Sequence, residues 1–378
     1  MCQINTRFFL RIYIFFCTFA SKMNKDLLYK ELEEWYEVNH RILPWRETDD
    51  PYKIWISEII LQQTRVAQGM EYYHRLITRF PDIQSLADAK EDEVLLYWQG
   101  LGYYSRARNM HKAAQLMKNH AIFHQAMRLL GDKVRGEEEG DEIFAALKSM
   151  PGVGDYTAGA IASFAFDLPY PALDGNVYRV LSRLYDCEIA FDTTQGKKHF
   201  RKLAEDLLDR EHPRLFNSAI MELGALHCVP TAPDCRTCPL NTWCKALANN
   251  TVELLPVRKP RPKVRDRYLE YTIYITPERT TLIHQRKGND IWKHLWEFVC
   301  AERSGEEAIR REAKGKKTLE LTHVLSHQKL HAKFVIKNVP ELPAIPDTVV
   351  VSLSDLDNYA FSRLTLNAIE KLLITYHS

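Results

Sequence analysis

The chain has 378 residues, of which 46% are hydrophobic and 26% are charged. It is too long for one ordinary domain and has the composition of a soluble globular protein with two or three domains. The net charge of +2 does not by itself indicate a nucleic-acid partner. Basic residues nevertheless cluster at one place in the chain: Arg258, Lys259, Arg261, Lys263, Arg265 and Arg267. Such a local basic stretch is a better indication of nucleic-acid binding than the total charge.

The N-terminal residues 8–20 are apolar, like the core of a signal peptide or a membrane segment. They are too few for an ordinary membrane span, include Arg11 and lack a clear small-residue cleavage site. A helical pattern follows Met23, so we expect translation to start there and residues 1–23 to be a non-native or disordered extension. No membrane association is expected.

Residues 24–40 have the pattern of an amphipathic helix. Residues 43–55 contain two prolines and a run of turn formers, and they predict a loop. Trp45 and Arg46 in this loop are either pocket residues or a packed tryptophan and a solvated arginine. The loop alone favours the second interpretation.

The stretch 55–66, WISEIILQQTRV, places Glu58 inside an apolar helical pattern. The neighbours three and four residues away are largely apolar, which predicts a desolvated carboxyl group. Desolvation favours the protonated form, and this suits an acid that donates a proton to a substrate near neutral pH. The alternative is a glutamate on a solvated face that bridges to Arg65. Helical patterns continue over 67–80 and 85–98.

The sequence GLGYYSR places two glycines and two tyrosines directly before a basic helix. One interpretation is that Tyr103 and Tyr104 stack on bases or wedge between them, while Arg106 and Arg108 contact phosphates. The other is a pair of core tyrosines.

The polar, glycine-containing segment 131–142 predicts a surface loop, and a helix is expected over 143–149. The following PGVG turn opens a helix rich in small residues, which is the helix-hairpin-helix pattern. The backbone N–H groups of Gly152, Val153 and Gly154 can hold a DNA phosphate without reading its sequence.

Asp174 precedes a clean apolar helical stripe, so it is expected at a helix N-terminus. An ordinary N-cap is one interpretation. The other interpretation is a functional carboxylate. The helix dipole would keep Asp174 ionised, while burial would favour the protonated form of Glu58. Two carboxyl groups in opposite protonation states suit an acid-assisted bond cleavage with a cationic transition state.

Four of the eight cysteines lie close together in the spacing C-x6-C-x2-C-x5-C, which indicates a metal or cluster site in a reducing compartment. They are Cys228, Cys235, Cys238 and Cys244. A structural zinc site more often has two close cysteine pairs, and four thiolates also suit an iron–sulfur cluster. The spacing favours the cluster over zinc, and over a pair of disulfides.

The chain resembles the MutY-type adenine-specific mismatch DNA glycosylases of the helix-hairpin-helix superfamily over roughly residues 27–250. The resemblance rests on LPWR, WISEIILQQTRV, GLGYYSR, PGVGDYTAGAI, LDGNVYRV, MELGALHC and the four-cysteine spacing. It implies an all-α helix-hairpin-helix glycosylase module with a [4Fe-4S] cluster held by the four cysteines.

The resemblance also implies roles for single residues. Glu58 would protonate adenine N7, Asp174 would stabilise an oxocarbenium-like sugar, and such enzymes extrude the target base from the duplex. Further residues are expected to support this pair or to contact the base and the DNA: Asn176, Tyr156, Arg46, Gln63, Thr64, Tyr103, Gly152, Gly154 and Glu222.

Two alternatives remain from the sequence. An endonuclease III-like glycosylase and lyase for oxidised pyrimidines would have a lysine nucleophile where this chain has Tyr156, so a monofunctional enzyme is favoured. A non-catalytic DNA-binding or electron-transfer cluster protein would need neither Glu58 nor Asp174.

Beyond Leu255 the composition changes, and residues 256–267 predict a basic, proline-interrupted linker. Strands are expected at YLEYTIYIT, TTLIHQRK, LWEFVC and KLHAKFVIKNV, with a closing helix over 361–376. This part resembles the family's α+β Nudix-like C-terminal domain, without a glutamate-rich metal box, so it is expected to read a lesion. Ser326 and His327 match the family's motif for 8-oxoguanine, although Leu325 stands where the family usually has an aromatic residue.

The expected domains are a helical catalytic module over 24–255, the linker, and a Nudix-like lesion-recognition domain over 268–378. Within the module we expect a six-helix barrel with the helix-hairpin-helix over about 50–160. A cluster subdomain would combine the N-terminal helix with about 161–255. The expected protein is a monomeric bacterial adenine DNA glycosylase in the cytoplasm, at the nucleoid when bound to duplexes with adenine opposite 8-oxoguanine or guanine.

Overall fold

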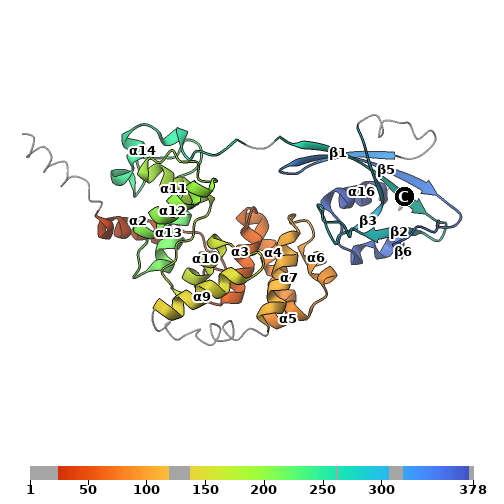
Figure 1. Cartoon of the computed structure of the whole chain (residues 1–378), viewed down its shortest axis with the longest axis horizontal. Coiled ribbons are helices and arrows are strands. Elements are labelled where there is room, and N and C mark those ends of the chain that lie inside the picture. Colours follow the sequence, from red (N-terminus) through yellow and green to blue (C-terminus); the bar gives the residue numbers. More distant parts are fainter. Residues whose placement is uncertain (1–23, 119–136, 261–262, 306–317, 374–378) are drawn as a thin grey trace, which may run out of the picture. The chain divides into compact units, whose positions relative to one another are not determined.

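The computed structural model describes residues 24–118, 137–260, 263–305 and 318–373 (Figure 1). The predicted N-terminal extension lies outside the described residues. The described chain forms two compact units, and neither is one continuous stretch of sequence. The first unit contains residues 24–54, 137–148 and 153–259, and the second contains the remainder. Within the described residues, no helix is both long enough and apolar enough to cross a lipid bilayer.

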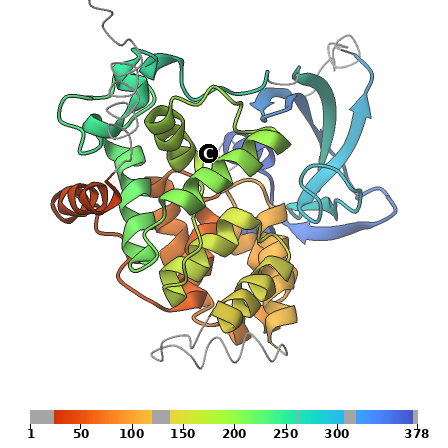
Figure 2. The ribbon, with the colours of Figure 1, turned by 60° about the vertical axis from the view of Figure 1, so that its left-hand side comes forward.

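The first unit is helical. Its elements are α2 (Lys25–Asn39), α9 (Glu137–Ser149, up to Lys148), α10 (Asp155–Phe166), α11 (Gly175–Tyr185), α12 (Thr194–Leu207), α13 (Pro213–Leu226), η1 (Asn241–Trp243), α14 (Lys245–Ala248) and η2 (Val252–Leu254). Helix α13 packs against both α2 and α11, and Figure 2 shows the red α2 beside α13. The apolar stripes of these helices form one core. The predicted helices after Met23 and after Asp174 are therefore confirmed.

The helices of the second unit are α3 (Pro51–Leu61, from Trp55), α4 (Val66–Arg79), α5 (Ile83–Asp88), α6 (Glu91–Trp98) and α7 (Ser105–Met117). Helix α7 packs against α5 and α6. The single helical pattern expected over 85–98 is wrong, because the chain leaves α5 at Ala89 in an extended conformation before α6 begins. The Ala89 carbonyl oxygen instead lies 3.0 Å from Nε2 of His111 on α7.

Two predicted loops are partly helical. Helix α3 begins at Pro51, inside the loop expected over 43–55, because the Asp50 carboxylate accepts a hydrogen bond of 2.9 Å from Tyr52 N, and proline fits the first helical position. The described part of the loop expected over 131–142 forms the first turns of α9. Acidic residues at a helix N-terminus favour this arrangement through the helix dipole.

The rest of the second unit is a six-stranded mixed sheet with one helix on it. Its elements are β1 (Arg265–Ile275), β2 (Thr280–Gln285), β3 (Trp296–Arg303), β4 (Thr318–Val324), β5 (Gln328–Asn338), β6 (Thr348–Ser352), η3 (Leu353–Asn358) and α16 (Arg363–Leu373). The strand order is β4-β5-β1-β3-β2-β6, and β1 pairs with β5 in parallel. Leu364 and Ala368 of α16 pack on the apolar face of the sheet.

The four predicted strands are confirmed, and β4 and β6 are additional. The closing helix is confirmed up to Leu373, and its expected last residues lie outside the described chain. Both additional strands are at sheet edges, where few of their residues are buried. Weak burial leaves little alternation in the sequence, so edge strands are harder to predict.

The predicted linker is wrong at its C-terminal end, because β1 begins at Arg265. Arg267 is buried and forms ion pairs with Asp290 and with Glu302, each at 2.7 Å. The hydrogen bonds from Arg267 hold the pKa of Glu302 below its usual range. Burial alone would raise the pKa of Asp290, but the hydrogen bond from Arg267 outweighs it and the net direction is down. Arg267 therefore stabilises the fold and does not belong to a solvent-exposed basic stretch.

We expect Arg267→Met to weaken the fold and to remove part of its acid sensitivity. A carboxylate with a lowered pKa stabilises the folded state above its unfolded pKa, and this stabilisation is lost as the pH falls through the folded value. Because Asp290 and Glu302 are partly exposed and screened by solvent, we expect a loss of about 1–2 kcal/mol at pH 7. The measurement is the thermal unfolding midpoint of the full chain at several pH values between about 3 and 7.

The matched control is Lys329→Met, which removes an exposed cation from the neighbouring strand β5. It should keep the steep fall of the wild-type midpoint at acid pH. Parallel pH profiles for wild type and Arg267→Met would contradict the assignment.

Candidate functional site

Asp174 is the N-cap of α11, as the sequence predicts. Its Oδ1 accepts hydrogen bonds from the backbone N–H groups of Asn176 at 2.9 Å and Val177 at 2.7 Å. Its Oδ2 accepts a third, at 2.8 Å, from the side-chain amide of Asn176. Three donors and the positive end of the helix dipole all favour the ionised carboxylate.

Asn176 connects Asp174 to a buried arginine. The Asn176 side-chain oxygen accepts a hydrogen bond of 2.9 Å from Arg179 Nη2. Arg179 also donates from Nε to the carbonyl oxygen of Cys228 at 2.7 Å and from Nη2 to that of Gly224 at 2.5 Å. Burial lowers the pKa of Arg179, whereas the nearby Cys228 raises it. A continuous series of hydrogen bonds thus joins the Asp174 carboxylate to the backbone of the first clustered cysteine.

Helix α13 can approach this series closely because it has glycine at position 224. A Cβ atom there would lie 2.7 Å from Cβ of Asn176 and 3.0 Å from its backbone. Even alanine would therefore force α11 and α13 apart, at the point where Asn176 holds Asp174.

The four clustered cysteines line one cavity in the first unit. Burial raises the pKa of Cys238 to about 12, and the three neighbouring cysteines raise it as well. Arg183 donates from Nη1 to Cys228 Sγ at 3.3 Å, and its carbonyl oxygen accepts a hydrogen bond from Cys244 Sγ at 3.5 Å.

This donor set fits a multinuclear metal group. Four partly buried thiols around one cavity would not all ionise without a strongly positive centre among them, and iron in a cluster would supply one. Among the histidine, cysteine, aspartate and glutamate side chains of the described ranges, no three are placed to hold a single metal ion.

Arg183 orders the backbone around the cysteines. It donates to the carbonyl oxygens of Val229 at 2.8 Å, Pro230 at 3.0 Å and Val252 at 3.0 Å. Neither Arg179 nor Arg183 was predicted from the sequence. Their signal was a spacing of four residues in α11, which places both on one face of the helix.

Glu58 lies in the second unit, whereas Asp174, Asn176 and Tyr156 lie in the first. The Glu58 side chain is buried on α3 among apolar residues, which confirms the predicted desolvation. A solvated Glu58 bridged to Arg65 is therefore wrong, since Arg65 is exposed beyond the end of the helix.

Arg106 holds the C-terminal end of α3. Its Nη1 donates to the carbonyl oxygens of Ile59 at 3.0 Å and Ile60 at 2.8 Å, and also to that of Gln62. Burial lowers the pKa of Arg106 to about 10. Arg106 is therefore a structural residue, and its predicted contact with phosphate is wrong. It also lies 3.4 Å from the hydroxyl of Thr64, so it fixes the turn that follows Glu58.

Gln63 in this turn is exposed and has a positive φ of 65°. Its side chain does not continue the helical face of Glu58, because α3 ends at Leu61. The helical pattern expected over 55–66 is therefore wrong beyond Leu61. Its predicted contact with the substrate stays a prediction.

Three predicted residues of the first unit have clear surroundings. The Glu222 carboxylate accepts two hydrogen bonds from the Arg41 guanidinium, at 2.6 and 2.8 Å. Arg41 was not predicted, because 181 residues separate it from Glu222. The Arg46 guanidinium lies 3.8 Å from the centre of the Phe164 ring. Tyr156, in the first turn of α10, is partly exposed.

The predicted hairpin turn is present before α10. Gly152 has φ of 80°, and Gly154 is the N-cap of α10 in an extended conformation. A Cβ atom at Gly152 would lie 2.9 Å from Cβ of Asn109, so both the backbone angle and the space require glycine. The N-terminal end of a helix such as α10 is a position that favours an anion, through the helix dipole.

A cavity of about 440 Å³ in the second unit brings together Tyr103, Ser326 and His327. Tyr103 is 48% exposed with φ of 45°, whereas Tyr104 is buried and donates a hydrogen bond to the Phe361 carbonyl oxygen at 3.2 Å. Burial raises the pKa of Tyr104 to about 12. The predicted pair thus consists of one exposed aromatic residue and one core residue.

Ser326 and His327 lie in the tight turn between β4 and β5. The Ser326 hydroxyl is 3.1 Å from Nδ1 of His327, and Leu325 N donates to the Gln328 carbonyl oxygen at 2.7 Å. The His327 carbonyl oxygen accepts a hydrogen bond of 3.1 Å from the backbone N–H of Arg265, the first residue of β1. The Leu325 side chain packs against the core of the sheet.

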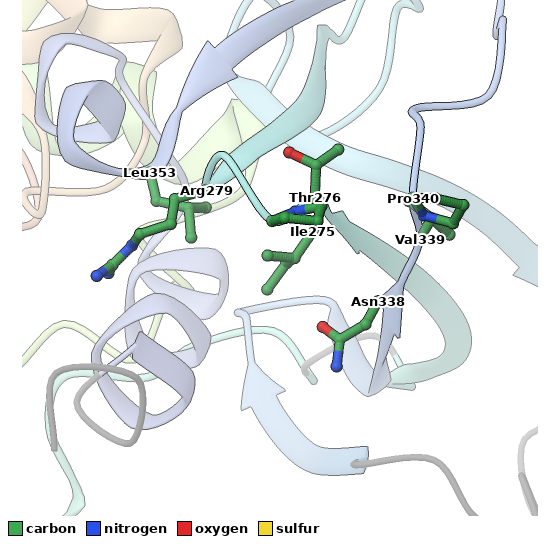
Figure 3. A pocket seen from close by; sticks show the side chains of 8 residues that line it. Ile275, Thr276, Arg279, Asn338, Val339, Pro340 and Leu353 are labelled. Atoms are coloured by element: carbon green, nitrogen blue, oxygen red, sulfur yellow. The ribbon is translucent and has the colours of Figure 1, made fainter.

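A second hollow of about 490 Å³ lies where β1 and β5 end (Figure 3). Of the described residues that line it, Arg279 alone is charged. Its side chain extends away from Asn338 and Pro340 (Figure 3). Polar groups do not converge here as they do at Asp174, so this hollow is not the candidate active site.

Comparisons with known proteins agree with this architecture. Residues 56–209 match the HhH-GPD superfamily of base excision DNA repair proteins, and residues 271–371 match the NUDIX domain. The adenine DNA glycosylase of Buchnera aphidicola subsp. Baizongia pistaciae is 34% identical over 279 residues, 73% of this chain and 74% of that relative. The adenine DNA glycosylase of Rattus norvegicus is 40% identical over 227 residues, 57% of this chain and 41% of that relative.

A solved structure of a thermostable thymine-DNA glycosylase is similar with a TM-score of 0.50 and 24% sequence identity. The alignment covers 60% of this chain and 97% of that one. At this identity the similarity supports the fold alone.

We expect Gly224→Ala to destabilise the protein by about 1–3 kcal/mol through the clash with Asn176. The matched control is Gly175→Ala, one residue after Asp174, where an added Cβ atom meets nothing within 4 Å. The control should unfold at or slightly above the wild-type midpoint, since alanine favours a helix more than glycine does. Thermal denaturation of the full chain measures both. Equal midpoints for the two variants would contradict the close packing described here.

Proposed function

This chain belongs to the adenine DNA glycosylase family within the HhH-GPD superfamily, and we propose that it excises adenine opposite 8-oxoguanine or guanine in double-stranded DNA. The observation that carries this mechanism is the contrast between two carboxyl groups. Glu58 is buried among apolar side chains, and Asp174 is held by three hydrogen-bond donors at a helix N-terminus. The surroundings of the two carboxyl groups thus differ, as in sites where one carboxyl group acts as an acid and the other stabilises a positive charge.

In the proposed reaction Glu58 donates its proton to N7 of the extruded adenine. The bond between the sugar C1′ and adenine N9 then breaks, and its electron pair leaves with the base. The Asp174 carboxylate stabilises the positive charge on the sugar, and water adds to C1′ and releases a proton. Asn176 keeps Asp174 in place through its 2.8 Å hydrogen bond, and Tyr156 supports the pair.

The alternatives receive less support. An endonuclease III-like lyase needs an amine nucleophile where this chain has Tyr156. Three relatives that align with this chain over most of their own length are named adenine DNA glycosylases. A non-catalytic DNA-binding protein would have no reason to bury a carboxyl group such as Glu58, since burial without a function is costly.

We further propose that Cys228, Cys235, Cys238 and Cys244 hold a [4Fe-4S] cluster. These four cysteines would hold the cluster as thiolates, and this would order the loop around the exposed Arg236. Arg183 prepares this loop through its donors to four carbonyl groups and to Cys228 Sγ. An ordered Arg236 can then contact a DNA phosphate.

We propose that residues 24–255 excise the adenine and that residues 268–378 recognise the lesion. We also propose that the protein acts as a monomer. Tyr103 wedges beside the oxidised guanine, and Ser326 and His327 offer polar groups to it. Their meeting around one cavity supports this proposal. Backbone N–H groups near Gly152 and Gly154 would hold a phosphate, while Arg46, Gln63, Thr64 and Glu222 would contribute to the adenine pocket.

We expect Glu58→Gln and Asp174→Asn each to lower adenine excision by at least ~10²-fold, because each removes an acid–base or charged group while keeping size and polarity. The measurement is the single-turnover rate on duplexes with adenine opposite 8-oxoguanine, at fixed salt. The control is Glu47→Gln, which changes an exposed carboxylate shortly before α3, the helix that carries Glu58. This variant should retain the wild-type excision rate. Near-normal excision by either catalytic variant would refute the mechanism.

The same assay tests the substrate. The wild-type chain should release adenine from duplexes with adenine opposite 8-oxoguanine or guanine, and leave thymine glycol intact. Release of thymine glycol without release of adenine would establish the lyase alternative instead.

We expect the purified protein to be brown and to hold about four iron atoms per chain. Elemental analysis after anaerobic purification measures this. Cys228→Ser should lower the iron content and the folding yield, whereas the buried Cys187→Ser, outside the cysteine cavity, should keep the iron. Zinc in place of iron would contradict the cluster.

A further inference from the structure

The cavity that contains Tyr103, Ser326 and His327 has another aromatic wall, formed by Trp292. Trp292 lies in the loop between β2 and β3, far along the chain from both Tyr103 and Ser326. At about 440 Å³ the cavity is within the range of roughly 300–1,000 Å³ that is typical of sites for small organic groups. It is therefore large enough to receive a nucleobase.

The backbone of Trp292 is in an unusual conformation. Its φ is 59°, in the left-handed region that bulky residues rarely adopt, and Tyr103 on the other wall has φ of 45°. Such strain persists only where the surroundings impose it, and it is concentrated at functional sites. Two aromatic residues with this conformation thus face one cavity.

The surroundings of Trp292 impose this conformation through Arg286. The Arg286 guanidinium donates to the Ile291 carbonyl oxygen at 3.2 Å and to Asp290 at 3.1 Å. Its backbone accepts from His294 N at 2.8 Å and donates to the Leu295 carbonyl oxygen at 2.9 Å. The guanidinium is itself fixed by Glu297, with contacts of 2.7 and 2.9 Å.

The loop is also tied to the wall that carries Tyr103. Arg108 of α7 donates to the Lys293 carbonyl oxygen at 2.8 Å, and His294 Nδ1 contacts the Glu91 carboxylate of α6. The two aromatic walls are therefore connected by hydrogen bonds. A cavity whose walls are already in place loses little entropy when a ligand enters it.

Trp292 supplies the cavity with an aromatic ring that residue 325 does not supply. The side chain before Ser326 is an aliphatic leucine, which lines the cavity and packs against the core of the sheet but has no ring to offer a base. On the same cavity, Trp292 offers an indole ring, which rests against the His323 ring at a centroid distance of 5.8 Å.

We propose that Trp292 binds and positions the base opposite the adenine in this glycosylase. Its indole ring is the surface against which the guanine-type base opposite the adenine packs, and this contact presents the edge of that base to Ser326 and His327. The inference rests on the proposed function, since it assumes a mismatched purine as the ligand. Packing against a ring tolerates any purine, and the polar groups supply the distinction between 8-oxoguanine and guanine.

The test compares duplexes that differ only in the base opposite adenine. Each contains a 2′-fluorinated adenine nucleotide, which resists excision, opposite 8-oxoguanine, guanine or an abasic site. Dissociation constants are measured for the full chain at fixed salt. We expect Trp292→Leu to weaken binding about fivefold or more when a purine is opposite, the lower end of the range for base–aromatic contacts. Binding to the duplex with the abasic site should not change, because that duplex has no base to pack.

Two further variants make the test specific. Trp292→Phe should retain most of the binding, since it keeps a ring. Trp292→Leu combined with Leu325→Phe should recover part of the loss, since it returns an aromatic residue to the same cavity. If Trp292→Leu does not fold, Trp292→Met replaces it as the non-aromatic variant, because methionine fills irregular space in a core.

The outcomes separate this inference from the proposed function. Failure of the wild-type chain to release unmodified adenine opposite 8-oxoguanine refutes the function. If the wild type is active but the non-aromatic variants bind all three duplexes as tightly as it does, the inference is wrong. An equal loss on all three duplexes, including the abasic one, also overturns it, because that result indicates a purely structural role for Trp292.

Discussion

The position of the Asp174 carboxylate at the N-terminal end of α11 is the constraint on which much of the packing in the first unit depends. Two backbone N–H groups and the Asn176 side chain hold it. Asn176 is in turn held by Arg179, whose other donors go to the carbonyl groups of Gly224 and Cys228. The position of one anion therefore depends on the packing of α13 against α11 and on the loop that contains the cysteines.

Buried arginines hold backbone carbonyl groups or carboxylates in place at several positions in this protein. Arg106 satisfies carbonyl groups at the end of α3, Arg183 does so around the cysteines, and Arg267 neutralises two carboxylates beside β1. A guanidinium has five donors in a fixed plane, so one side chain can hold several acceptors of irregular backbone. The irregular segments are the ones that follow Glu58 and surround the cysteines. The backbone at these sites is thus held in place by buried guanidinium groups.

The sequence predicts those parts that depend on neighbours along the chain. The stripe in α11, the N-cap at Asp174 and the turn at Gly152 are local patterns, and all three are present. The pairing of Arg41 with Glu222 joins residues 181 positions apart, so no local pattern could reveal it. One of the two interpretations made Arg106 a phosphate contact, because a basic residue after a glycine turn has the same sequence whether it faces DNA or the end of α3. The edge strands β4 and β6 were missed since their side chains are only weakly buried.

The parallel pairing of β1 with β5 has a mechanical consequence. Arg265, where the chain enters the sheet, donates its backbone N–H to the carbonyl oxygen of His327 at 3.1 Å. The turn that carries Ser326 and His327 is thus attached to the first residue of the strand that follows the connecting segment. A pull on that segment acts on the turn directly, without passing through the rest of the sheet. A change in the connecting segment therefore reaches Ser326 and His327 through a single backbone hydrogen bond.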